Sequence, residues 1–204
     1  MKHLAIITGT GRGLGKALKV QFENIGWTVA ELNRPEFDLS SIDAETLAEK
    51  FRALDSADVG RVVFVNNAAT QVIAPAASLQ ANDIAREITI NITSPIVAIA
   101  TFLRSFPNGE VANVTSIAAT KAFPHWSLYC AAKAALEGYL RAVEAEGIRV
   151  FNLNPGAIDT DMQGAIRLSA FPGVEDFVAL QKDGKLKSAD IVARSLVWMI
   201  DRAD

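Results

Sequence analysis

The chain has 204 residues, of which 50% are hydrophobic and 21% charged, and this fits one soluble domain, residues 1–204, with a full hydrophobic core. A net charge of −3 without long basic runs argues against nucleic acid or a membrane surface as a partner, and two histidines without a Cys/His cluster argue against a bound metal. The chain has no signal-peptide pattern, no stretch near ~18 uninterrupted apolar residues and a single cysteine, so we expect a cytoplasmic protein that acts on a small molecule.

The first expected element is a short apolar strand at residues 4–7, and a glycine-rich turn follows at residues 8–15. A helical period of apolar residues then continues to Gly26, so the glycines lie between a strand and a helix. At such a turn a pyrophosphate can rest on the free amides of a helix N-terminus, although glycines also form tight turns that bind nothing. The position before a helix favours a dinucleotide site.

Residues 27–32 predict a second strand, which ends near Asn33 and Arg34 because Pro35 cannot continue the hydrogen bonding of a sheet. In a dinucleotide site this strand end faces the adenosine ribose. A carboxylate there binds the free 2′-hydroxyl of NAD, whereas an arginine favours the 2′-phosphate of NADP. We assign Asn33 and Arg34 to this place and no acid, which favours NADP, and the alternative is a solvated surface arginine.

The segment after the second strand is unusually short. Residues 37–40 follow almost at once, which leaves no room for a helix, so one layer of the usual strand–helix alternation is missing. Either Ser41 or Asp43 can then cap a helix that continues to Leu54.

A third buried strand is expected at residues 61–65, and amides and small residues follow it at positions 66–69. The carboxyl end of a parallel strand is where a ligand binds, although asparagines also form ordinary turns. Residues 82–106 predict a long helix, in which Pro95 should disturb the hydrogen bonding. Asn91 lies near this disturbance, and we expect it to have a functional as well as a capping role.

Ser116, Tyr129 and Lys133 are the main candidates for chemistry. A strand expected at residues 109–115 ends at Ser116, and a helix expected at residues 127–146 carries Tyr129 and Lys133 on one face. Free tyrosine has a pKa near ~10, and a neighbouring ammonium lowers it, so the pair can act as an acid/base unit. An alanine-rich helix can also carry this pair by chance, so the chemical interpretation depends on the hydroxyl and the dinucleotide site.

Residues 148–153 predict another strand, which ends at Pro155-Gly156, and residues 157–187 predict a substrate lid. Side chains near the expected site supply apolar and aromatic surface for a pocket, and the alternative is that the aromatic ones form the core of the lid: Ile117, Phe123, Trp126, Ile158, Met162 and Phe171. Such a wall favours a small, mostly apolar ketone or vicinal dicarbonyl over a sugar, a steroid or a charged acid. A final helix at residues 188–200 should bury one stripe, made of Ile191, Leu196 and Ile200.

Together these residues resemble the short-chain dehydrogenases/reductases from Thr8 to about Asp161, with each family motif in order. The resemblance implies a single-domain, doubly wound α/β (Rossmann) fold, a parallel sheet with helices on both faces. We expect this fold to be shortened after the second strand and at the C-terminus, because the chain stops at Asp204, before the last strand that family members add. Within the family, residues 150–163 are similar to the sepiapterin reductase and benzil reductase branch.

The resemblance also implies a role for each member of a catalytic tetrad. Tyr129 is the general acid, Ser116 orients the carbonyl, Lys133 holds the nicotinamide ribose and lowers the pKa of Tyr129, and Asn91 positions a relay water. Arg12 stands where NADP-preferring members carry a basic residue. The implied cofactor site contains Gly9, Thr10, Arg12, Gly13, Leu14, Gly15, Asn33, Arg34, Asp38, Leu39, Asn67, Ala68, Ala69, Tyr129, Lys133, Pro155, Gly156, Ile158 and Thr160.

We therefore expect an NADPH-dependent carbonyl reductase, which the family resemblance predicts to be a homodimer formed through the helices at residues 82–106 and 127–146. One alternative is an NAD-linked alcohol dehydrogenase of the same fold. Another is a non-catalytic nucleotide-sensing protein, because fold alone does not give function. The intact Ser116, Tyr129 and Lys133 argue against a sensor, which needs no proton donor.

Overall fold

A computed structural model of the protein describes residues 2–54 and 59–203, in which strands and helices alternate. Five parallel strands form one sheet in the order β2-β1-β3-β4-β5. In chain order the strands are β1 (Lys2–Thr8), β2 (Thr28–Leu32), β3 (Val59–Asn66), β4 (Glu110–Val114) and β5 (Val150–Leu153). The chain passes from β1 outward to β2 and then back to β3, which confirms the doubly wound fold and places the reversal of strand order between β1 and β3.

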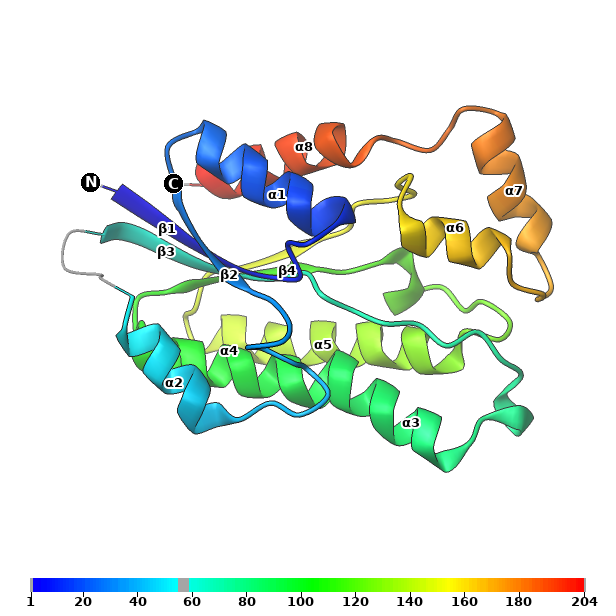
Figure 1. Ribbon diagram of the computed structural model, residues 1–204, viewed down its shortest axis with the longest axis horizontal. Coiled ribbons are helices and arrows are strands. Elements are labelled where there is room, and N and C mark those ends of the chain that lie inside the picture. The colour runs from blue at the N-terminus through cyan, green and yellow to red at the C-terminus, as the bar shows by residue number, and fades with distance from the viewer. Residues whose placement is uncertain (1, 55–58, 204) are drawn as a thin grey trace.

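Helices cover both faces of this sheet (Figure 1). One face carries α1 (Gly13–Asn24) and α8 (Ala189–Asp201), and the other carries α2 (Ala44–Arg52), α4 (Ser94–Ser105) and α5 (Ser127–Ala145). Side chains of β1 alternate between the two layers, because Ala5 and Ile7 pack with α1 and α8 whereas Leu4 and Ile6 pack with the opposite helices. The short apolar run of β1 is therefore buried on both faces, as predicted.

The predicted inner stripe of α8 is correct for Leu196 and Ile200 and wrong for Ile191, whose exposed fraction is 59%. On a helix, residues four apart lie on the same face, so the residue that continues the stripe before Leu196 is Val192. Val192 is indeed buried against the sheet with Leu196 and Ile200, and Ile191 lies one position off the stripe.

The connection from β2 to α2 is short, as predicted, and the described residues 33–43 hold no strand or helix. β2 is consequently an edge strand. Asp43, and not Ser41, caps α2, because its carboxylate accepts a hydrogen bond from the Glu45 amide at 2.8 Å. The helix ends at Arg52, two residues before the predicted end.

The long helix predicted at residues 82–106 consists of α3 (Ala81–Ile88), one π-helical turn at Thr89–Thr93 and α4. The disturbance therefore lies around Asn91, one turn before Pro95, which has no N–H to continue the hydrogen bonding of the preceding turn. The run Ala81–Ser105 is long and apolar enough to cross a membrane by length and composition alone. Its apolar composition has a different cause here, because Ala98, Ile99 and Phe102 pack in the core beside the sheet.

The predicted lid contains α6 (Asp161–Arg167) and α7 (Val174–Lys182), which lie near the carboxyl ends of the strands (Figure 1). Its base is tied by two backbone hydrogen bonds, from Asp159 N–H to the Lys187 carbonyl (2.9 Å) and from Lys187 N–H to the Ala157 carbonyl (3.1 Å). Two short 3-10 turns, Ala76–Ser78 and Ile117–Ala119, lie in the loops after β3 and β4.

Candidate active site

The glycine-rich turn lies at the carboxyl end of β1 and packs against the residues that follow β3. The side-chain amide of Asn67 donates to the carbonyl oxygens of Thr8 (2.9 Å) and Gly9 (3.2 Å). A Cβ on Gly15 would lie 2.0 Å from the Gly9 carbonyl oxygen, so only glycine lets α1 begin this close to the turn. Within the described part of the chain, no side chain caps the first turn of α1, which also contains no acid. This turn fits a dinucleotide, since its helix amides are open to a pyrophosphate.

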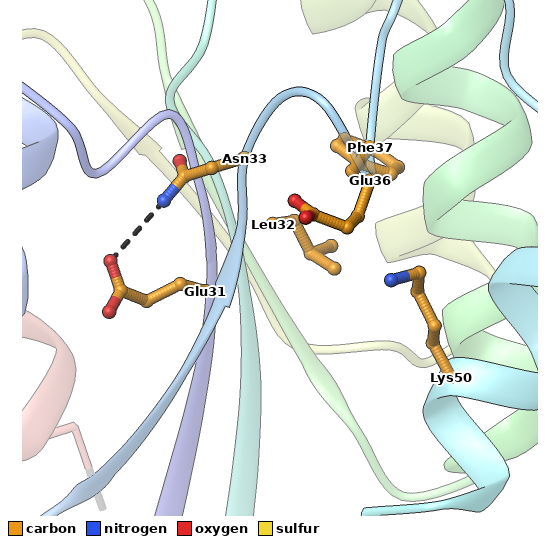
Figure 2. A pocket seen from close by; sticks show the side chains of 6 residues that line it. All are labelled: Glu31, Leu32, Asn33, Glu36, Phe37 and Lys50. Atoms are coloured by element: carbon orange, nitrogen blue, oxygen red, sulfur yellow. Dashed lines mark hydrogen bonds between the residues drawn. The ribbon is translucent and has the colours of Figure 1, made fainter.

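Asn33 fastens the end of β2 to the same turn. Its side-chain oxygen accepts from the Thr10 amide at 2.9 Å, and its NH2 group donates to the Thr10 hydroxyl at 2.7 Å. Arg34 follows as an exposed side chain. A pocket of about 300 Å³ opens beside this strand end (Figure 2), and its lining residues are Glu31, Leu32, Asn33, Glu36, Phe37 and Lys50.

The prediction that no acid belongs to this strand end is wrong, because Glu31 takes part in the Asn33 and Thr10 network. Its carboxylate accepts from Asn33 Nδ2 at 3.3 Å and from the Thr10 hydroxyl. Glu31 lies two residues before Asn33 on a strand, so both side chains point to the same side, as Figure 2 shows. The alternation of side chains along an extended strand is the signal that places Glu31 on the same side as Asn33.

Arg12, at the start of α1, pairs with Asp161 at 3.3 Å, and both side chains are largely exposed. This pair joins the glycine-rich turn to the first residue of α6. The side chain of Thr160 lies 3.5 Å from the position that a Cβ on Gly13 would take, so the predicted residues Gly13 and Thr160 do come together. Thr160 also caps α6 by accepting from the Gln163 amide at 3.4 Å.

The contacts of several other predicted cofactor residues are with neighbouring protein groups. Asp38 accepts from the Ser40 amide at 2.8 Å, which holds the pKa of its carboxyl below the usual value. Gly156 has a positive φ of 72° and its amide donates to the Asn154 side chain. Three apolar members are buried, Leu39 in the core on the α2 side and Leu14 and Ile158 in the core on the α1 side, whereas Ala68, Ala69 and Pro155 are partly buried.

Ser116, Tyr129 and Lys133 meet at the carboxyl end of β4. Tyr129 and Lys133 project from neighbouring turns of α5 and are 8% and 5% exposed. The Lys133 ammonium donates to the Val114 carbonyl at 2.8 Å and lies 5.5 Å from the centre of the Tyr129 ring. The Ser116 hydroxyl oxygen accepts from the Ala118 amide at 3.2 Å and lies within hydrogen-bonding reach of the Tyr129 phenol.

Burial shifts the pKa values of both groups on α5. It raises the pKa of Tyr129 to about 12, and the hydrogen bond with Ser116 offsets only part of this effect. It lowers the pKa of Lys133 to about 8, against the opposing influence of the Glu137 carboxylate. The resemblance predicts a lowered pKa for Tyr129, whereas its pKa lies above the ordinary value, because burial is the largest influence on it.

Asn91 lies in the π-helical turn and is 4% exposed. Its side-chain oxygen accepts from the Thr70 amide at 2.9 Å, and its NH2 group donates to the Glu87 carboxylate at 3.0 Å and the Thr70 carbonyl at 3.1 Å. Glu87 is itself buried and accepts from the Thr70 hydroxyl at 2.8 Å. The Asn91 side chain thus joins the turn to the loop after β3, a role that its isolated position in the sequence did not reveal.

Aromatic side chains of the lid pack against Trp126, which in turn contacts Tyr129. Trp126 lies edge-on to the Tyr129 ring with centroids 6.0 Å apart, and it also contacts Phe171 at 5.7 Å and Phe177 at 5.2 Å. Of the predicted wall residues, Phe123, Trp126 and Phe171 belong to this cluster, Ile158 lies in the sheet core, and Ile117 and Met162 are 51% and 37% exposed. The aromatic members are therefore both the core of the lid and the neighbours of Tyr129.

Comparisons with known proteins agree with this arrangement. The family model for short chain dehydrogenase matches residues 56–170. The chain is 30% identical to a benzil reductase ((S)-benzoin forming) of Bacillus subtilis, over 98% of this chain and 94% of that protein. It is 28% identical to a sepiapterin reductase of Xenopus tropicalis, over 97% and 91% of the two chains. The crystal structure of the KRED1-Pglu enzyme has the same fold, with a TM-score of 0.83, 23% identity and coverage of 100% and 96%.

The glycine-rich turn at the reversal of the sheet, the Ser116, Tyr129 and Lys133 cluster and the matched family model point the same way. Members of this family bind nicotinamide cofactors, and the turn described above fits one. The chain belongs to the short-chain dehydrogenase/reductase family and is an oxidoreductase of that family.

Proposed function

We propose that the protein is an NADPH-dependent carbonyl reductase that converts a small ketone or dicarbonyl into an alcohol. The observation that carries this proposal is the cluster of the partly buried Ser116 with the buried Tyr129 and Lys133 beside the dinucleotide turn. A protein that only senses a nucleotide has no need of a proton donor at this place.

The cofactor supplies the hydride that the carbonyl carbon receives. Tyr129 donates its phenolic proton to the carbonyl oxygen as negative charge develops there. Burial raises the pKa of Tyr129 to about 12, so this proton is present at neutral pH. The Ser116 oxygen already accepts from a backbone amide, so its own proton is available to orient the same carbonyl. The nearby Lys133 ammonium stabilises the phenolate that remains.

The surroundings of Tyr129 support an apolar, aromatic substrate. Phe123, Trp126 and Phe171 provide aromatic surface, and aromatic rings stack well on such walls. The indole N–H of Trp126, close to Tyr129, is buried without an acceptor among the residues that the structure describes. The benzil reductase relative is named for a vicinal dicarbonyl, which supports a substrate of this class.

The choice of NADPH rests on Arg34, an exposed side chain directly after the end of β2. A charge-assisted, bidentate arginine contact to a 2′-phosphate is worth roughly 1.5–3 kcal/mol, or at least about tenfold in affinity. We expect Arg34→Ala to weaken the binding of NADPH at least about tenfold and to change the binding of NADH little. Arg12→Ala should have the same effect to a smaller degree. Titrations of cofactor fluorescence measure this, with Arg194→Ala on α8 as the matched control. Equal losses for both cofactors contradict the assignment.

The function is tested by following NADPH and NADH oxidation with a panel of carbonyl compounds. We expect aromatic and aliphatic diketones to react fastest, and NADPH to be used in preference to NADH. Faster reaction with sugars or bulky steroids contradicts the proposed substrate class. A preference for NADH favours the NAD-linked alternative, and binding without turnover of any carbonyl or alcohol favours the nucleotide sensor.

A further inference from the structure

Lys19 of α1 and Glu31 of β2 form an ion pair next to the adenosine end of the proposed cofactor site. Their side chains are 31% and 36% exposed, so the pair is only partly screened by solvent. The other carboxylate oxygen of Glu31 accepts from the Thr10 hydroxyl and, at 3.3 Å, from Asn33 Nδ2. Glu31 thus contacts both the glycine-rich turn and the end of its own strand, and Figure 2 shows its carboxylate turned toward Asn33.

These contacts stabilise the ionised form of Glu31, whose carboxylate already accepts hydrogen bonds within the protein. The hydrogen bond from Lys19 is the largest influence that lowers the pKa of the Glu31 carboxyl, and the bond from Thr10 is the next. Lys19 also lies 4.0 Å from the carboxylate of Glu23, one turn further along α1. The contact with Glu31 is the closer of the two, so Lys19 mainly offsets the charge of Glu31.

An acid near this strand end has opposite consequences for the two nicotinamide dinucleotides. A free carboxylate accepts a hydrogen bond from the 2′-hydroxyl of NAD and repels the 2′-phosphate of NADP. In this chain the acid is present, but most of its acceptor capacity is used by Thr10, Asn33 and Lys19. Its negative charge is offset by the Lys19 ammonium.

We propose that Lys19 is a specificity-determining residue, which makes the adenosine site compatible with a 2′-phosphate by neutralising Glu31. The inference rests on the proposed use of NADPH and adds a mechanism for the preference that lies outside the arginines. Without Lys19, Glu31 is an uncompensated charge beside the ribose. The lone Glu31 carboxylate then favours a 2′-hydroxyl over a 2′-phosphate.

Binding of nucleotide fragments tests this without any turnover. Isothermal titration compares 2′,5′-ADP, which has the 2′-phosphate, with 5′-AMP, which has the same 5′-phosphate and a free 2′-hydroxyl, on the full chain. Lys19→Met keeps the length of the side chain and removes its charge. We expect it to weaken binding of 2′,5′-ADP roughly three- to tenfold at low salt and to leave the affinity for 5′-AMP within about twofold, and the difference should shrink at high salt.

The double variant Lys19→Met/Glu31→Gln makes the test specific for the pair. Removing the uncompensated carboxylate should return the affinity for 2′,5′-ADP to within about twofold of the wild type. Lys182→Met, an exposed lysine at the end of α7, is the matched control and should change neither affinity.

Two results overturn the inference alone. Equal weakening of both fragments by Lys19→Met means that the lysine only supports the turn. Weakening of 2′,5′-ADP that Glu31→Gln does not rescue means that Lys19 acts on the phosphate without Glu31. If the wild-type protein binds neither fragment, the proposed function fails together with this inference.

Discussion

At the scale of single residues, Tyr129 and Lys133 lie in the same buried environment, and it has opposite effects on their charges. The phenol keeps its proton up to a pKa of about 12, and the ammonium loses its proton at a pKa of about 8. Carbonyl reduction requires Tyr129 protonated and Lys133 charged. Both conditions hold below pH ~8, and Lys133 is the first to fail as the pH rises.

Glu137 stands one turn beyond Lys133 on α5, accepts from the Thr115 hydroxyl at 2.5 Å and holds the pKa of Lys133 higher than burial alone would. We predict that kcat/KM for NADPH is constant at neutral pH and falls as the pH rises through about 8, because this parameter reports the free enzyme. Removing the carboxylate disfavours the ammonium, so Glu137→Gln should move the fall to lower pH. Glu144→Gln, an exposed acid on the same helix, should leave the profile unchanged. Identical profiles for all three proteins contradict the role given to Glu137.

At the scale of elements, an amide ladder crosses the sheet near the site. Asn66 of β3 donates to Asn113 of β4 at 2.9 Å, and Asn113 donates to Asn152 of β5 at 3.0 Å. The three residues pair in register on adjacent parallel strands. Asn113 is fully buried and Asn66 is 3% exposed, so the ladder fixes the register of strands whose carboxyl ends carry the site.

We predict that Asn113→Leu lowers the free energy of unfolding by about 1–3 kcal/mol, because it leaves the buried Asn66 amide without a partner. Urea denaturation followed by circular dichroism measures the loss. Asn24→Leu, at the exposed end of α1, is the control and should change stability by less than about 0.5 kcal/mol. A loss no larger than that of the control would show that the ladder contributes nothing to the sheet.

The sequence predicted the elements whose burial follows from a local pattern. The runs at residues 4–7 and 62–65 were readable because strands buried on both faces are continuously apolar. Tertiary contacts decided the rest. The contact of Asn91 with Thr70 joins separate segments, and the α8 stripe is set by which residues meet the sheet, so neither could be read from local spacing.

The candidate site divides in the same way. Motif spacing located Ser116, Tyr129 and Lys133, because the ends of parallel strands and one helical face bring them together. The charge states of these groups depend on desolvation, which a sequence does not show, and so the pKa of Tyr129 was predicted in the wrong direction. Glu31 was missed because its role depends on Lys19 of a different element.

At the scale of the whole molecule, α5 has a second face beyond the one that packs on the sheet. Ala132 and Leu136 are buried, whereas Ala131, Ala134 and Ala135 are exposed. Small side chains allow close helix packing, so this exposed face is where we expect a second copy of the chain to dock. The exposed three alanines do not pack on the sheet.

We predict a homodimer, with a mass by light scattering about twice the 21.9 kDa of the chain at micromolar concentration. Ala135→Arg should convert it to a monomer by placing a bulky charge in the interface. Ala44→Arg on the exposed start of α2 should leave the dimer intact. A monomeric wild-type protein contradicts the prediction.

The central claim is that Tyr129 is the proton donor of a carbonyl reductase. Tyr129→Phe keeps the ring that packs against Trp126 and removes only the hydroxyl. The most direct measurement is the single-turnover rate of NADPH oxidation with a diketone, together with the affinity for NADPH, in the wild type and this variant. We expect the rate to fall by about 10²–10⁴ while the affinity stays within about twofold. A rate near that of the wild type, with NADPH still bound, would contradict the account.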